Sequence, residues 1–197
     1  MKIHTFTQKS EEWQKIRLGK LTASDGQTIA TAGKGLETLV YTKVAQKLTG
    51  IIPEGYSNAD IERGNELEEM ARNAYELETG NVVKQIGFCE FDEYSGASPD
   101  GLIDKDGLVE LKCPNDKNFV EYLYTNKVDM GYFWQMQMQM YVTERQWCDY
   151  AVFNPNFSKS LIIKKLNKDE KAIEKIKNGL NVGKEMIIKI MGKIRRI

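Results

Sequence analysis

The sequence predicts a mixed α/β protein with a central mixed β-sheet flanked by helices. Apolar residues recur at helical spacing in the first third of the chain, the middle changes to a two-residue period, and an amphipathic helical pattern ends the chain. This order is typical of a sheet with helices packed on it. We expect a single domain over residues 1–197, because a chain of this length can bury one proper core.

The first third is expected to be helical. Ser10 precedes an acidic first turn, as an N-cap residue does, and Thr22–Asp25 opens a second, short helix. Apolar residues from Leu36 to Leu48 have helical spacing, which Gly50 ends.

A longer helix should follow a turn at Pro53–Gly55. It runs from Asn58 to Thr79 and is closed by Gly80. Its buried stripe is predicted to consist of Leu67, Met70, Ala71, Ala74 and Tyr75.

The middle of the chain has the composition of strands. We expect one strand over Val82–Phe91 and the end of another at Ala97–Ser98. Leu102–Ile103 and Leu108–Lys112 flank Asp104–Gly107, which has the residue types of a hairpin turn.

Two helices, two strands and a final helix should follow the hairpin. The helices are expected over residues 119–124 and 132–142, and the strands over residues 147–153 and 161–165. The C-terminal amphipathic helix should run from about residue 167 to 190. Gly179 and Gly183 are predicted weak points of that helix, because glycine costs about 1 kcal/mol in a helix interior.

Composition excludes several classes of protein. Hydrophobic residues make up 41% of the chain and charged residues 28%, as in ordinary globular proteins. No apolar run is long enough to cross a membrane. The N-terminus lacks the apolar region of a secretory signal. We therefore expect a cytoplasmic protein without membrane association.

Cysteine and histidine usage narrows the possible chemistry. The 3 cysteines, at positions 89, 113 and 148, form no CxxC pair, and His4 is the single histidine. Disulfide scaffolds, zinc ribbons, iron–sulfur ligation and histidine-based catalysis are therefore disfavoured. Any hydrolytic chemistry must depend on carboxylates, lysine and hard cations.

Charge is unevenly distributed although the net charge is +0. Eleven Lys or Arg stand against four Asp or Glu from Ile163 to Ile197, and acidic residues crowd the stretch from Glu54 to Glu78. A basic face with an acidic centre suits an enzyme that binds phosphate and holds cations. A basic but merely solvated helix face is the alternative.

The segments Ser98-Pro99-Asp100-Gly101 and Glu110-Leu111-Lys112 carry the predicted chemistry. Glu110 and Lys112 are two apart on a predicted strand and so share a face. The intervening hairpin brings Asp100 alongside Glu110. Two carboxylates and an ammonium then converge on one spot.

Such a trio suits metal-dependent phosphodiester hydrolysis. Carboxylates hold Mg²⁺, and the Leu111 carbonyl could add a further oxygen. Lys112 could orient or deprotonate a water, or stabilise charge on the phosphate. An ordinary Glu/Lys pair on an exposed strand is the alternative, but the apolar residues around it argue against a solvent-facing strand.

Two further segments could contribute to this site. Glu68 on the long helix could reach the metals, or belong to a solvated acidic face. Gln135 and Gln139 share a helix face at i,i+4, with Tyr132 one turn before Gln135. A Met-rich core helix with polar edges is the other interpretation of that segment.

These pieces, in this order, resemble the lambda exonuclease family, also called YqaJ-type viral recombinases, within the PD-(D/E)XK nucleases. The resemblance covers roughly residues 10 to 155. Its matching segments are residues 13–24, Arg63-Gly64 with residues 68–72, SPDG at 98–101, ELKCP at 110–114, residues 135–137 and residues 141–143.

The resemblance implies a restriction-endonuclease-like core and a role for each matching residue. It makes Lys112, Glu110, Asp100 and Gln135 catalytic, and Asp100, Glu110, the Leu111 carbonyl and Glu68 metal ligands, with Glu66 or Glu69 as substitutes for Glu68. It also implies a pocket for the 5′ phosphate and DNA formed by Arg17, Ser24, Ser98 and Tyr132.

The implied activity is a Mg²⁺-dependent 5′–3′ exonuclease on linear double-stranded DNA. Mn²⁺ should substitute, with two ions per site. The products would be 5′-mononucleotides and 3′ single strands for phage-type recombination in a bacterial host. The resemblance also implies a ring-shaped homotrimer and a single-strand annealing protein as partner. This chain is shorter than the family's best-known member. A related endonuclease and a catalytically inactive DNA-end-binding module are the alternatives.

Overall fold

The computed structural model describes residues 1–51 and 59–194. The chain begins with β1 (Lys2–His4) and α1 (Glu11–Arg17), followed by β2 (Leu21–Thr22), the 3₁₀ turn η1 (Ala23–Asp25), α2 (Gly26–Thr31) and α3 (Lys34–Thr49). Ser10 is the predicted N-cap, and its side chain accepts a hydrogen bond from the Trp13 N–H. Gly50 ends α3 in the left-handed conformation, with φ 67°.

The long helix α4 (Ala59–Thr79) ends at Gly80, whose φ is +70°. Its residues Ala71 and Tyr75 are fully buried on the side that faces the sheet, as predicted. Met70 is 50% exposed, so its assignment to the buried stripe was wrong. Only a narrow stripe of the helix contacts the sheet. Met70 is next to Ala71 in the sequence, and successive residues of a helix point about 100° apart, so its side chain is directed away from that stripe. The predicted turn at Pro53–Gly55 and the start at Asn58 lie outside the described residues.

The strand predicted over Val82–Phe91 is two strands, β3 (Val83–Lys84) and β4 (Phe88–Glu90). They belong to different sheets, since β3 pairs with β6 (Gly101–Ile103) whereas β4 pairs with β1 and β5 (Ser95–Ala97). The Gln8 side chain donates to the Ile86 carbonyl in the break between them. The apolar pattern alone could not reveal this break, because the side chain that hydrogen-bonds to the backbone there is distant in the sequence.

A five-stranded sheet has the order β3-β6-β7-β8-β9. Its further strands are β6 (Gly101–Ile103), β7 (Gly107–Lys112), β8 (Trp147–Phe153) and β9 (Leu161–Asn167). β7 and β8 are parallel, and the other neighbours are antiparallel. The crossover from β7 to β8 contains α5 (Asp116–Thr125) and α6 (Met130–Thr143). The smaller sheet has the order β1-β4-β5-β2.

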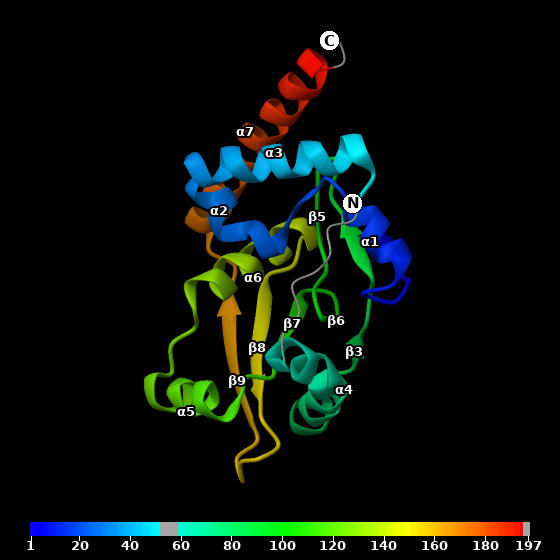
Figure 1. Cartoon of the computed structure of the whole chain (residues 1–197). Coiled ribbons are helices and arrows are strands. Elements are labelled where there is room, and N and C mark those ends of the chain that lie inside the picture. The colour runs from blue at the N-terminus through cyan, green and yellow to red at the C-terminus, as the bar shows by residue number, and fades with distance from the viewer. Residues whose placement is uncertain (52–58, 195–197) are drawn as a thin grey trace.

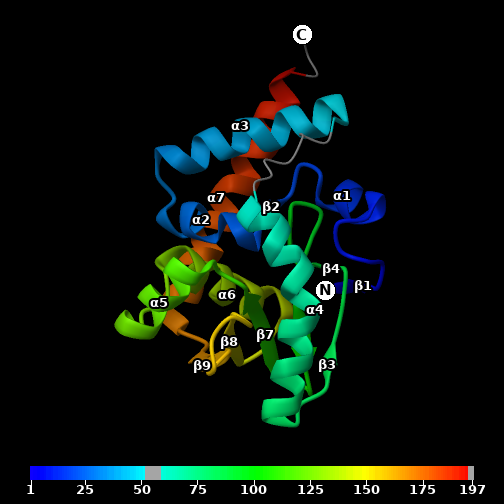
Figure 2. The ribbon, with the colours of Figure 1, turned by 60° about the horizontal axis from the view of Figure 1, so that its bottom comes forward.

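Helices cover both faces of the five-stranded sheet (Figures 1 and 2). One face of the β7–β8 pair packs against α4 through Val109, Leu111, Ala151 and Phe153. The alternate residues, including Leu108, Tyr150 and Val152, belong to the other core, which also contains residues of α5 and α6. Because strand side chains alternate between faces, Glu110 and Lys112 lie on the side of α6.

The last helix, α7 (Glu170–Ile194), gathers with α2 and α3 at one end of the molecule (Figure 1). It runs unbroken through Gly179 and Gly183, so neither glycine interrupts the helix, and a weakening of the helix at these positions stays a prediction. A Cβ on Gly179 would lie 1.8 Å from the Ile29 carbonyl oxygen, and one on Gly183 would lie 2.8 Å from Leu21 Cδ1. These glycines let α7 approach its neighbours closely. Among the described residues, no helix is long and apolar enough to cross a membrane.

Candidate active site

The end of β7 carries the two residues at the centre of the site. Glu110 is 1% exposed, and Lys112 Nζ lies 2.6 Å from its Oε1. They share a face of the strand, as their spacing predicts. Burial of an ion pair requires further hydrogen bonds to satisfy the remaining polar atoms.

Helix α6 supplies those bonds from above the sheet. Gln135 Nε2 donates to Glu110 Oε1 over 2.6 Å, and Gln139 Nε2 donates to Oε2 over 2.7 Å. Tyr132, on the same helix, lies beside Lys112, with 4.8 Å between Nζ and the ring centroid. The Met-rich core interpretation is also correct, since Met136, Met138 and Met140 are buried, so α6 serves both the core and the site.

Asp100 reaches the same place from the start of the hairpin. Gly101 pairs with Val109, which puts Asp100 level with Glu110, and Asp100 Oδ2 accepts a hydrogen bond from the Leu111 N–H over 2.7 Å. Burial, followed by the charge of Glu110, raises the pKa of Asp100 to about 8. The two carboxylates therefore repel one another in the absence of a cation.

The same two carboxylates determine the charge state of Lys112. Burial by itself lowers the pKa of this ammonium, but Glu110 and Asp100 outweigh burial and raise it. In the metal-free protein Lys112 is thus a cation paired with Glu110. Its role, as a cation that orients groups or stabilises charge or as a base, stays a prediction.

A small cavity of about 170 Å³ joins this centre to the N-terminal residues of the predicted phosphate pocket. Its lining includes Arg17, Ser24 and Ser98 together with Asp100 and Lys112. By volume, the cavity offers room for roughly six water molecules at about 30 Å³ each. It is sized for a small anion and its hydration.

Arg17 and Ser98 are held in place at this cavity by Trp13. Trp13 Nε1 donates to Ser98 Oγ over 2.8 Å, Arg17 Nη1 donates to the same oxygen over 3.3 Å, and the guanidinium lies 4.1 Å from the indole centroid. Burial lowers the pKa of Arg17 to about 10, opposed by Asp25, so Arg17 stays charged at neutral pH. The Ser24 hydroxyl lies 3.0 Å from that of Thr22.

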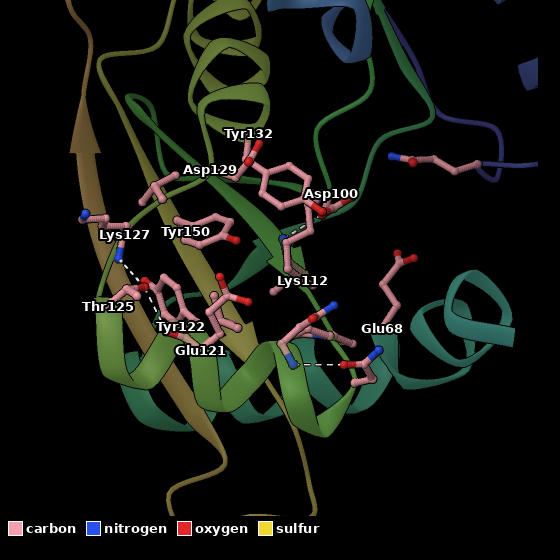
Figure 3. Close-up of a pocket in the computed structure, with 18 of the residues that line it drawn as sticks. Glu68, Asp100, Lys112, Glu121, Tyr122, Thr125, Lys127, Asp129, Tyr132 and Tyr150 are labelled. Carbon is pink, nitrogen blue, oxygen red and sulfur yellow. Dashed lines mark hydrogen bonds between the residues drawn. The ribbon is translucent and has the colours of Figure 1, made fainter. Parts of the chain in front are cut away.

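A larger groove of about 1090 Å³ reaches the centre from the other side (Figure 3). Its walls come from α4, α5, α6 and β8, and Tyr122, Tyr132 and Tyr150 lie along it. Gln8 lines both the groove and the small cavity, and donates to the Pro99 carbonyl over 2.9 Å. Asp100 and Lys112 thus stand where the two spaces meet.

Glu68 lines the groove but is engaged by two cations. Lys9 Nζ lies 3.1 Å from one of its oxygens and Arg72 Nη2 lies 3.0 Å from the other. Glu66 and Glu69, the substitutes, are exposed. In the described ranges, no group of three or more His, Cys, Asp or Glu side chains is placed to hold a metal ion. The structure therefore brings together Asp100 and Glu110, without Glu68 as a third ligand.

The paired carboxylates nevertheless suit a hard divalent cation. Mg²⁺ prefers oxygen ligands and keeps several waters, so one or two carboxylates suffice to hold it. Asp100 and Glu110 supply such oxygens, and Leu111 also lines the groove. A divalent cation held by them would offset the repulsion that, after burial, raises the pKa of Asp100.

Sequence reasoning missed three residues of this arrangement. Gln139 could have been assigned, because its i,i+4 spacing from Gln135 placed both on one helix face. Trp13 lay inside a matching segment but received no role. No sequence signal pointed to Gln8, which enters the site from a loop.

A family model for the YqaJ-like viral recombinase domain matches residues 12–146. The match covers more than half of the chain, so the protein belongs to this family, as the sequence resemblance predicted.

Solved structures agree. The alkaline exonuclease LHK-Exo from Laribacter hongkongensis is 33% identical, with a TM-score of 0.87 over 95% of this chain and 97% of that one. Its complex with dAMP gives 34% identity and a TM-score of 0.85 over the same shares. A phage-related exonuclease from Haemophilus somnus 129PT, at 15% identity and a TM-score of 0.69 over 89% of this chain and 96% of that one, shares the fold. The predicted mixed α/β fold is confirmed, and these likenesses support a nuclease.

A curated relative is the uncharacterized protein R354 of Acanthamoeba polyphaga mimivirus, which is 27% identical over 171 residues. The match covers 76% of this chain and 29% of the viral protein. The chain thus spans less than a third of that relative.

Proposed function

We propose that the protein is a Mg²⁺-dependent 5′–3′ exonuclease that acts on linear double-stranded DNA. It would release 5′-mononucleotides and leave 3′ single strands for recombination. The observation that carries this proposal is the small cavity, where Arg17, Ser24 and Ser98 line the same space as Asp100, Glu110 and Lys112. Family membership and the LHK-Exo likeness support it.

Arg17 and Ser98 support the proposed direction of the enzyme. Arg17 is a fixed cation with hydrogen-bond donors that suit phosphate oxygens, and Ser98 adds a hydroxyl. A space of about 170 Å³ has room for a terminal phosphate. A site that binds a terminal phosphate requires a DNA end, which favours an exonuclease over an endonuclease.

The larger groove would admit the duplex, and its aromatic wall at Tyr132 would lie along the strand. Asp100, Glu110 and the Leu111 carbonyl would hold Mg²⁺, with Mn²⁺ as a substitute. When bound, such an ion lowers the pKa of a water and offsets charge on the phosphate.

This chain's own residues would do the rest. Lys112 would stabilise the negative charge that grows on the scissile phosphate. Gln135, bonded to Glu110, borders the same cavity and can orient a water by hydrogen bonding. A second ion at Glu68 would require that carboxylate to leave Lys9 and Arg72. We also propose a homotrimer and an annealing protein as partner, on the family resemblance alone.

A Lys112→Ala variant tests the proposed centre. Wild-type protein in Mg²⁺ should degrade a linear duplex and spare a closed circular one. Lys112→Ala should lose at least about a hundredfold in rate, as when one stabilising group of a transition state is removed. Gel electrophoresis of both substrates gives the answer.

The other outcomes discriminate between the alternatives. Equal cutting of circular DNA would indicate an endonuclease. Binding of DNA ends without cleavage, in Mg²⁺ or Mn²⁺, would indicate an inactive end-binding module.

A further inference from the structure

Glu110 is the most enclosed carboxylate of the proposed metal site, with 1% exposure. A charged group so far from water is strongly disfavoured unless it is paired and hydrogen-bonded. Its Oε1 receives Lys112 and Gln135, as described above. Among the described residues, Gln139 is the donor that reaches Oε2. The orientation of the carboxylate thus depends on a side chain whose function the family resemblance does not assign.

The amide of Gln139 is itself costly to bury. Its side chain is 0% exposed, and its Oε1 atom has no hydrogen-bond partner in the described part of the chain. An unsatisfied buried acceptor costs about 1–3 kcal/mol. A methionine of similar length, like Met138 and Met140 beside it, would fill the space without that cost but would leave Glu110 Oε2 without its donor. The bond to Glu110, and not packing, therefore explains a glutamine here.

The direction of the amide follows from its partner. A carboxylate accepts only from the amide nitrogen, so the Gln139 carbonyl must point the other way. Gln139 lines the small cavity together with Asp100 and Glu110.

We propose that Gln139 is a positioning residue of the metal site: it holds Glu110 Oε2 so that the carboxylate faces the cation. The inference rests on the proposed function and adds to it a residue that binds neither DNA nor metal. Groups that orient metal ligands from behind typically contribute 10- to 100-fold in metal affinity.

The chain offers a matched control on the same helix. Gln137 is also 0% exposed, and both the nitrogen and the oxygen of its amide are bonded: it donates to the Asn167 carbonyl over 3.0 Å and accepts from the Asp169 N–H over 2.9 Å. These partners join β9 to α7 and lie away from Glu110. Gln137→Met therefore removes an equally buried amide without touching the site.

The test is Mn²⁺ binding by isothermal titration calorimetry on the metal-free full chain, with thermal unfolding measured in parallel. Gln139→Met should weaken Mn²⁺ binding about tenfold or more. It should also lower the melting temperature of the metal-free protein, because the buried Glu110 Oε2 loses its donor. Gln137→Met should lower the melting temperature and leave Mn²⁺ affinity unchanged. A purely structural glutamine at position 139 would behave like Gln137: its replacement would lower the melting temperature without weakening Mn²⁺ binding.

Gln139→Asn provides a second variant if Gln139→Met does not fold, since the shorter amide cannot reach Glu110. Folded position-139 variants that bind Mn²⁺ within about twofold of wild type would overturn the inference. Wild-type protein that binds no Mn²⁺ would instead contradict the proposed function, and the inference with it.

Discussion

At the scale of single residues, the site is built from charged side chains whose burial lowers the stability of the folded protein. Asp100 and Glu110 are neighbouring carboxylates drawn away from water, and Lys112 compensates only in part, so the pKa of Asp100 is raised. Sites arranged to bind a cation commonly carry such perturbed groups. The arrangement is best understood as prepared for a positive charge that the chain itself does not supply.

This cost predicts a pH-dependent effect of Asp100→Asn. The folded-state pKa of about 8 lies above the ordinary value of 3.8, so the stability linked to the Asp100 proton is complete below about pH 4 and is lost as pH rises toward 8. Without divalent cations, Asp100→Asn should therefore raise the melting temperature by a few degrees near pH 8.5, and by much less near pH 4.5. Thermal unfolding in EDTA at both pH values measures this. An equal shift at both would contradict the assigned cause.

The central trio could be predicted because its geometry is local. A two-residue period places Glu110 and Lys112 on one face, and a hairpin of fixed register returns Asp100 beside them. Gln8 and Trp13 could not be given roles in the same way. Their partners, Pro99 and Ser98, are more than 80 positions away, and no local pattern encodes such contacts.

At the scale of elements, the structure of α6 explains why its sequence allowed two interpretations, a Met-rich core helix and a helix that contributes to the site. Glutamine alternates with methionine from Gln135 to Met140, and 100° per residue distributes both types around the helix. Gln135 and Gln139 point to the site, whereas Gln137 bonds to the junction of β9 and α7. The pattern could show which glutamines share a face, but not which face meets Glu110.

Helix α7 shows how glycine can be a packing device rather than a break. Gly179→Ala should destabilise the protein by about 1–3 kcal/mol, because its Cβ would overlap the Ile29 carbonyl of α2. Gly192→Ala, on the same helix with nothing within 4 Å, should instead stabilise it by up to about 1 kcal/mol.

Urea unfolding of the two glycine variants provides the comparison. Opposite signs are expected. A similar small effect of both alanines would mean that α7 does not approach α2 as closely as described.

At the scale of the whole molecule, the charge pattern has a different meaning from the first expectation. The lysines of α7 line neither the groove nor the small cavity in the described structure, while Glu121 and Asp129 lie in the groove. Basic residues of the C-terminal part therefore do not surround the site within one chain. The solvated-face interpretation fits α7 of a single chain better.

The proposed homotrimer offers another way to retain DNA, since a ring encloses its substrate without a strongly basic surface. Light scattering during size-exclusion chromatography should give about three times the 22.6 kDa chain mass. A mass of one chain at micromolar concentration would contradict the trimer while leaving the chemistry of the site untouched.

The central proposal for this protein is that a terminal phosphate in the small cavity directs DNA to Asp100, Glu110 and Lys112. The most direct measurement compares rates on linear duplexes with 5′-phosphate and 5′-hydroxyl ends in Mg²⁺, for wild type and Arg17→Leu. Wild type should prefer the phosphorylated end by about tenfold or more, the value of a charge-assisted hydrogen bond, and Arg17→Leu should lose that preference. Equal wild-type rates on both ends would contradict the claim.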